Sequence, residues 1–128
     1  MNILYLEDSV FFQNIISEFV KEYSSIFCTD NEIIFKTYLN DNLSKIDIVL
    51  LDYIVKDIDV LELIQYIKKI SFFIPIIILT GYGKDTVVVQ CFKNGCNDYI
   101  SKLDLSKELF RDCIFINYQK FLKIKEYV

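Results

Sequence analysis

Five short apolar runs alternate with five amphipathic stretches along the chain. Each run has the length and composition of a buried strand, and each stretch repeats its apolar residues at helical spacing. We therefore expect strands at Asn2 to Leu6, Ser25 to Cys28, Asp47 to Leu51, Pro75 to Leu79 and Asp98 to Ser101. Strands that alternate with helices are joined by crossovers and run parallel. The pattern predicts an α/β fold of five βα units, in which helices cover both faces of a five-stranded parallel sheet.

Capping and breaking residues mark the expected helices. These run from Ser9 to about Tyr23, from Thr29 to about Leu43, onward from the polar loop at Lys56 to Asp59, from about Lys84 to Lys93, and from Asp104 almost to the end. Ser9 and Asp104 are the N-caps that we expect, because a short side-chain oxygen can accept from a free backbone N–H. Thr29 and Glu32 have the Thr-x-x-Glu spacing of a capping box.

Two helices have apolar faces whose buried side can be predicted. The third is expected to turn Leu61, Ile64 and Ile67 inward, with Lys68 at the edge of that face. In the last helix we expect a core stripe at Leu105, Leu109, Cys113 and Ile116, beside an adjoining arc at Phe110, Ile114 and Phe121. The two arcs together are wider than one core contact requires, which leaves open a partner or homodimer surface and ordinary packing.

Length and composition favour one globular domain. The chain has 128 residues, of which 53% are hydrophobic and 25% charged, so we expect residues 1–128 to form a single domain. The longest apolar run, Phe72 to Leu79, is too short for a membrane span, and no basic leader precedes the first strand. These features predict a cytoplasmic protein that makes no membrane contact.

The histidine content, the cysteine spacing and the net charge argue against several kinds of function. The chain has no histidine, so any histidine-based catalysis or phospho-histidine must be supplied by a partner. The four cysteines, Cys28, Cys91, Cys96 and Cys113, lack metal-binding spacing, and we expect reduced, core-filling thiols. A net charge of −4 argues against direct nucleic-acid binding.

Polar residues follow four of the predicted strands. Glu7 and Asp8 follow the first strand, and Asp52, Thr80 and Lys102 follow the third, fourth and fifth. The carboxyl ends of parallel strands meet at one edge of a sheet, where ligands bind. Three carboxylates there would repel one another by about 1 kcal/mol per pair even in water, so we expect a hard cation among them. Mg²⁺ fits best, and Asp52 becomes the nucleophile of a phosphoryl transfer.

Taken singly, each of these residues has an ordinary structural explanation. Glu7 and Asp8 suit the start of a helix, Thr80 suits a turn, and Lys102 suits a solvated surface. Tyr99 is typical of a packed strand aromatic. Their joint occurrence at one predicted edge is what favours a site.

The sequence resembles the bacterial response-regulator receiver family over nearly its whole length. Matches to the family's acidic pair, phosphoacceptor, switch hydroxyl, tyrosine and lysine fall at Glu7, Asp8, Asp52, Thr80, Tyr99 and Lys102, within ILYLEDS, DIVLLDYIVKDID, PIIILTGYG and NGCNDYISK. Five matched features in the right order are far more specific than a lone motif. The resemblance implies a flavodoxin-like, doubly wound sheet with strand order 2-1-3-4-5.

The resemblance also implies a phosphoacceptor of two-component signalling rather than an enzyme. A sensor histidine kinase or a histidine phosphotransfer protein would donate a phosphoryl group to Asp52. Mg²⁺ would be held by Glu7, Asp8, Asp52 and the backbone carbonyl of Ile54.

A change of shape would follow phosphorylation, again by resemblance. Lys102 would pair with the phosphate, Thr80 would move inward, and Tyr99 would follow into the space it leaves. The surface of the fourth helix, fifth strand and fifth helix would then act on a downstream partner, on a covalently linked output domain, or on a second copy in a homodimer.

Several positions depart from the family pattern. Leu103 replaces the usual Pro, so we expect a trans bond between Lys102 and Leu103. Lys56 and Val60 replace a Pro and a Gly in the loop after Asp52, which leaves the path of that loop and its metal affinity open to change.

Two bulky residues bear on the lifetime of the phosphorylated state. By family analogy, Ile54 and Tyr82 occupy the positions that gate water access to the acyl phosphate. Because both are largely apolar, we expect slow self-dephosphorylation.

Other functions occur on the same architecture. A pseudo-receiver would signal without phosphorylation; the missing Pro and Gly favour it, whereas the five site residues speak against it. A flavodoxin needs a Gly-rich phosphate loop after the first strand, and a haloacid-dehalogenase-type phosphatase needs Asp where Ile54 stands. The chain is expected to act alone or as the N-terminal part of a longer protein.

Overall fold

A computed structural model of the chain describes residues 1–81 and 84–127. Its centre is one parallel sheet in the order β2-β1-β3-β4-β5, which confirms the predicted fold class and strand order. The strands are β1 (Asn2–Leu6), β2 (Ser25–Thr29), β3 (Ile48–Leu51), β4 (Ile76–Thr80) and β5 (Asp98–Ser101). Each matches a predicted strand to within one residue at either end.

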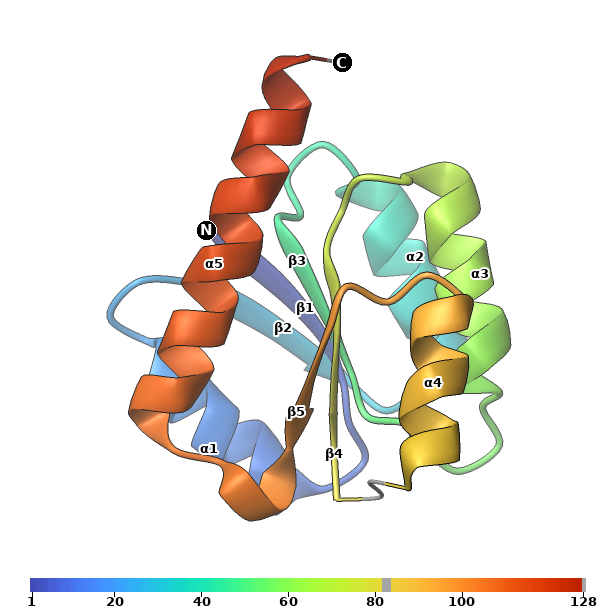
Figure 1. Cartoon of the computed structure of the whole chain (residues 1–128), viewed down its shortest axis with the longest axis vertical. Coiled ribbons are helices and arrows are strands. Elements are labelled where there is room, and N and C mark those ends of the chain that lie inside the picture. The colour runs from blue at the N-terminus through green and yellow to red at the C-terminus, as the bar shows by residue number, and fades with distance from the viewer. Residues whose placement is uncertain (82–83, 128) are drawn as a thin grey trace.

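Helices cover both faces of the sheet, as Figure 1 shows. Of these, α1 (Val10–Val20) and α5 (Lys107–Glu126) lie on one face, and α2 (Glu32–Asp41), α3 (Val60–Ile70) and α4 (Asp85–Lys93) lie on the other. A short 3₁₀ helix, η1 (Lys102–Asp104), joins β5 to α5. None of the described helices is long and apolar enough to cross a membrane.

The central strands are apolar on both sides because each face of the sheet has its own core. In β1, Ile3 and Tyr5 pack toward α1 and α5, whereas Leu4 and Leu6 pack toward the other three helices. Successive side chains of a strand point to opposite faces, so a continuous apolar run fills both cores. The burial of these runs holds the carboxyl ends of the strands in register.

The predicted boundaries of the first two helices need correction. The first helix ends at Val20 rather than near Tyr23. Thr29 does not open a capping box, because it pairs with Leu6 as the last residue of β2; Asn31 caps α2 by accepting from the Ile34 N–H at 2.9 Å. Pairing in the sheet thus takes precedence over a local capping pattern.

The start of the last helix also differs from the prediction. Asp104 belongs to η1, and Ser106 caps α5 by accepting from the Leu109 N–H at 3.1 Å. The peptide bond between Lys102 and Leu103 is trans, as expected.

The predicted buried faces of two helices need correction. In α3 the buried residues are Val60, Leu63, Ile64 and Ile67, so Leu63 takes the place expected for Leu61. In α5, Phe110, Ile114 and Phe121 of the adjoining arc are buried. Of the predicted core stripe, Leu105 and Cys113 pack partly buried against the core, whereas Leu109 and Ile116 are 46% and 52% exposed. The 3₁₀ turn before α5 and its later cap at Ser106 set which side of the helix meets the sheet.

Candidate functional site

The carboxyl ends of β1 and β3 bring three acidic residues together. The sheet ladder continues past both strands, because the Glu7 N–H donates to the Thr29 carbonyl and the Asp52 N–H donates to the Leu6 carbonyl, each at 3.0 Å. Carboxylate oxygens of Glu7, Asp8 and Asp52 lie within 4.8 Å of one another. Glu7 and Asp52 are buried, whereas Asp8 is exposed. The structure therefore gathers the acidic cluster that the sequence predicted.

Lys102 contacts two of the three carboxylates of this cluster. Its Nζ lies 2.7 Å from Glu7 Oε1 and 3.2 Å from Asp52 Oδ2. The side chain is only 10% exposed, and the ring of Phe12 lies 4.1 Å from the ammonium. One lysine thus pairs with two buried carboxylates, which leaves excess negative charge at this edge of the sheet.

Burial makes the charged form of Glu7 unfavourable. Desolvation is the main reason that its pKa is raised above the ordinary value, and the nearby Asp52 carboxyl acts in the same direction. Hydrogen bonds from Lys102 and from the Tyr5 hydroxyl, which lies 2.7 Å from Glu7 Oε1, oppose the rise. Burial, and then the contact with Glu7, raise the pKa of Tyr5, so that its hydroxyl stays a donor.

The donor set of the cluster suits a hard divalent cation. Three carboxylates supply only oxygen ligands, and one of them is exposed to solvent that can complete a hydrated ion. A cation there would also favour the charged form of Glu7. The residues present therefore fit Mg²⁺.

Thr80 and Tyr99 lie on β4 and β5, the two strands beyond β3 in the sheet. Thr80 is the last residue of β4 and is 2% exposed, and its partner in the ladder is Ser101, directly before Lys102. Tyr99 pairs with Ile78 and packs on the face covered by α2, α3 and α4. Its hydroxyl is buried and has no hydrogen-bond partner within residues 1–81 and 84–127.

The loop after Asp52 lies beside the cluster. The Ile54 N–H donates to Asp52 Oδ1 at 3.4 Å, and the Ile54 side chain is 54% exposed. Further along, Asp57 adopts a φ of 64°, a left-handed conformation that Asp tolerates. Tyr82, the other predicted gating residue, lies outside the described residues.

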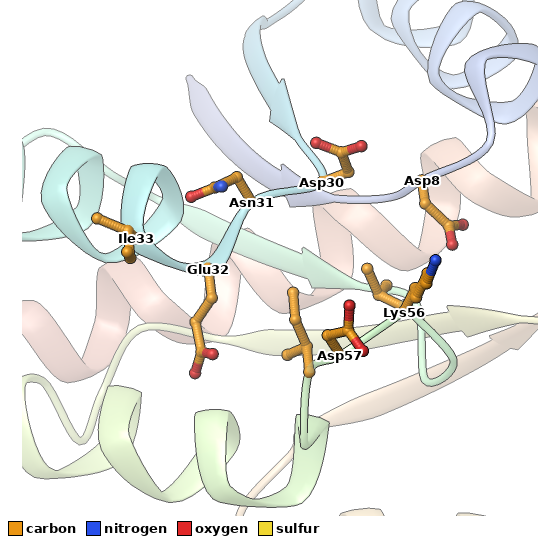
Figure 2. Close-up of a pocket in the computed structure, with 9 residues that line it drawn as sticks. Asp8, Asp30, Asn31, Glu32, Ile33, Lys56 and Asp57 are labelled. Carbon is orange, nitrogen blue, oxygen red and sulfur yellow. The ribbon is translucent and has the colours of Figure 1, made fainter.

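A cavity of about 430 Å³ opens beside Asp8, between this loop and the start of α2. Figure 2 shows Asp8 and Lys56 at one end of it and Glu32 and Ile33 at the other. Its charged lining residues are Asp8, Asp30, Glu32, Asp57 and Lys56. Because four of these five residues are acidic, the cavity attracts cations toward Asp8, the exposed residue of the cluster.

Three residues that support the site were not predicted. Tyr5 donates to Glu7, Phe12 covers Lys102, and Gln13 donates through Nε2 to the Glu7 carbonyl at 2.6 Å. Tyr5 had a sequence signal, because residues two apart on a strand share a face, and it is the one polar ring in an aliphatic run. Phe12 and Gln13 meet the site only through the placement of α1.

Comparison with known sequences identifies a family. A family model described as the response regulator receiver domain matches residues 3–112. Regulatory protein VanRc of Enterococcus gallinarum is 39% identical over 57 residues, which are 44% of this chain and 24% of VanRc. The match thus covers about a quarter of that relative's length.

Solved structures share the fold. A response regulator receiver domain protein from Clostridium thermocellum has a TM-score of 0.83 and 20% identity, over 99% of this chain and 98% of that one. NtrX from Brucella abortus has a TM-score of 0.89 and 19% identity, over 98% of this chain and 29% of that one. In the second case the shared fold is one part of a longer protein.

Proposed function

The chain belongs to the family of response regulator receiver domains, and from that premise we propose that it is a phosphorylation-dependent switch whose phosphoacceptor is Asp52. The observation that carries the proposal is the position of the Asp52 carboxylate, which is buried, 3.2 Å from the Lys102 ammonium and within 4.8 Å of carboxylate oxygens of Glu7 and Asp8. A nucleophile so placed has a cation ready for the negative charge that a phosphoryl group brings.

The donor would be a phospho-histidine on a histidine kinase or a phosphotransfer protein. An Asp52 oxygen attacks phosphorus, the P–N bond breaks, and its electron pair returns to the imidazole of the partner. Lys102 then pairs with an oxygen of the new acyl phosphate. This chain has no histidine, so the donor must lie on another chain or segment.

Mg²⁺ is the cofactor that we propose for this step. Glu7, Asp8 and Asp52 would hold it, together with the Ile54 carbonyl by resemblance to the family. When bound, Mg²⁺ supplies positive charge that neutralises the transferred phosphoryl group. Tyr5 and Gln13 keep Glu7 oriented toward the cluster, through its side chain and its carbonyl respectively.

The response would pass through Thr80 and Tyr99. Thr80 is buried at the end of β4, one strand from Asp52, so a modest movement brings its hydroxyl to the phosphate. Tyr99 lies on the neighbouring strand, and its unpaired buried hydroxyl makes its position sensitive to such a movement. The surface of α4, β5 and α5 would then change and act on a downstream partner or an output domain.

A pseudo-receiver is the second candidate, favoured by the Lys56 and Val60 departures in the loop after Asp52. Beryllofluoride with Mg²⁺, which mimics an acyl phosphate, separates the two functions. A switch predicts changed amide resonances at Thr80 and Tyr99 in the wild type and none in Asp52→Asn. Acetyl phosphate should add one phosphoryl group to the wild type alone, as seen by mass spectrometry. Unchanged resonances together with an unchanged mass would support the pseudo-receiver.

The remaining expectations about this switch are proposals of the same kind. We expect slow self-dephosphorylation because Ile54 and Tyr82 are both bulky and largely apolar residues, no direct binding to nucleic acid because the net charge is −4, and a cytoplasmic location. A phosphoryl lifetime of seconds in the presence of Mg²⁺ would count against the first of these.

A further inference from the structure

A groove lies between β5 and the exposed side of α5. It encloses about 430 Å³ and is lined by Asp98, Tyr99, Ile100, Ser101, Asp104, Leu109, Asp112, Cys113 and Ile116. Leu109 and Ile116 are 46% and 52% exposed, so the apolar side of the groove is open to solvent. Exposed branched side chains two turns apart on the same side of a helix are typical of a contact surface.

The charged residues of the groove are all acidic. Its described lining contains three aspartates and no lysine or arginine. Asp98 is already occupied, because the Asn117 Nδ2 donates to its Oδ2 at 2.9 Å and the Cys113 thiol lies 3.3 Å from the same oxygen. Asp104 and Asp112 are exposed at the rim, and the nearby Lys102 is directed to Glu7 instead.

The pairing of Asp112 does not remove this charge. Arg111 approaches Asp112 at 3.6 Å, but both side chains are more than half exposed, and such pairs are weak. A second copy of the chain is a poor occupant, since a two-fold axis through the groove would bring the two acidic rims together. Charge complementarity therefore favours a basic partner.

We propose that this groove binds a partner segment in which apolar side chains are flanked by lysine or arginine. The apolar side chains would cover Leu109 and Ile116, and the basic groups would meet Asp104 and Asp112. The inference rests on the proposed function, because the groove is part of the surface of α4, β5 and α5 that would act on a partner, and Tyr99 and Ser101 in its lining link its shape to the switch.

A short synthetic peptide with central leucines flanked by lysines is the probe. Titrated into the isotope-labelled full chain, it should shift amide resonances at Leu109, Ile116 and their neighbours. A peptide with glutamate in place of lysine, or serine in place of leucine, should bind at least about tenfold more weakly. Equal binding of either control peptide, or shifts that map to another face, would overturn the proposal.

Substitutions with matched controls test whether the named residues of the groove bind the peptide. Asp104→Asn with Asp112→Asn should weaken the peptide about fivefold, whereas Glu22→Gln with Asp41→Asn, which removes the same charge from exposed positions elsewhere, should not. Ile116→Ser should weaken it, and Ile33→Ser, at a 77% exposed position on α2, should leave it unchanged. Equal effects of test and control variants would contradict the assignment.

Two further measurements separate this inference from its alternatives. If sedimentation shows a dimer that Ile116→Ser dissociates, a second copy occupies the groove and the proposal fails. The titration is also run with and without beryllofluoride and Mg²⁺. If the peptide binds but beryllofluoride changes no resonance at Thr80 or Tyr99, the groove assignment holds and the proposed switch is refuted. If beryllofluoride changes those resonances but the peptide does not bind, the switch holds and the groove assignment is refuted.

Discussion

Lys102 holds together two carboxylates that would otherwise repel each other. It contacts Glu7 and Asp52 at 2.7 and 3.2 Å in a setting where all three side chains are at most 10% exposed. When one charge of a buried ion pair is removed, the loss of stability exceeds the net contribution of the intact pair, because the remaining charges stay buried without a partner. The residue is thus as important for folding as for the proposed chemistry.

Replacement of Lys102 is the direct test of this arrangement. Lys102→Gln should lower the free energy of unfolding by about 3 kcal/mol in metal-free buffer at neutral pH, as measured by urea denaturation. Lys36→Gln is the control, since Lys36 pairs with Glu32 at 3.2 Å on a partly exposed helix surface and should cost under about 0.5 kcal/mol. Equal losses in the two variants would show that the buried pairing contributes nothing special.

Glu7 should make the stability of the metal-free protein depend on pH. Its pKa is raised in the folded state, so its contribution is fully present below its ordinary pKa of 4.5 and is lost as the pH rises through the raised value. In Glu7→Gln this loss is absent, so the variant should gain stability relative to the wild type over that pH interval. Urea denaturation at pH values below and above this interval measures the difference in the free energy of unfolding, and Glu22→Gln, at an exposed position, is the control. If the free energies of unfolding of Glu7→Gln and the wild type depend on pH in the same way, the prediction is wrong.

Among the helices and strands, α5 differs most from what the sequence predicted. Its 20 residues begin after η1, and its buried side carries Phe110, Ile114 and Phe121. Periodicity predicted two apolar arcs, but the core stripe expected from it was only partly right, because both arcs have helical spacing. The choice depends on where the chain leaves β5, and it leaves Leu109 and Ile116 available for the groove.

The cap of α5 gives a local test of that path. Ser106→Ala should lower the free energy of unfolding by about 1 kcal/mol, because the Leu109 N–H loses its acceptor. Asp104→Ala should change it by less than about 0.5 kcal/mol, since Asp104 ends the 3₁₀ turn and caps no α-helix. The opposite order of effects would favour the cap at Asp104 that the sequence suggested.

For the whole molecule, the acidic edge of the sheet couples ion binding to folding. The cluster that would hold Mg²⁺ joins residues that follow β1 and β3, so it exists only when the sheet is formed. A ligand of the folded state alone stabilises it by mass action, by about 2.7 kcal/mol at a hundredfold excess over its Kd.

Magnesium should therefore raise the melting temperature of the wild type more than sodium chloride does at equal ionic strength. Asp8→Asn should remove most of this rise, because Asp8 is the exposed ligand of the cluster. Asp30→Asn, at a residue that lines the neighbouring cavity without belonging to the cluster, should keep it. Equal responses to the two salts would show that the cluster has no specific affinity for the ion.

The sequence by itself determined the fold class and which polar residues lie at the carboxyl edge of the sheet. Five apolar runs separated by helical stretches allow little besides a parallel sheet, and Glu7, Asp8, Asp52, Thr80 and Lys102 all lie at or just past the end of a strand. Local order along the chain was enough here, because the ends of parallel strands must meet.

Only the tertiary structure decided how those residues are paired. The contact of one lysine with two carboxylates, the support from Tyr5, Phe12 and Gln13, and the side of α5 left exposed all depend on how helices lie on the sheet. The physical reason is that a helix pattern fixes which residues share a face, whereas packing against other elements fixes where that face points.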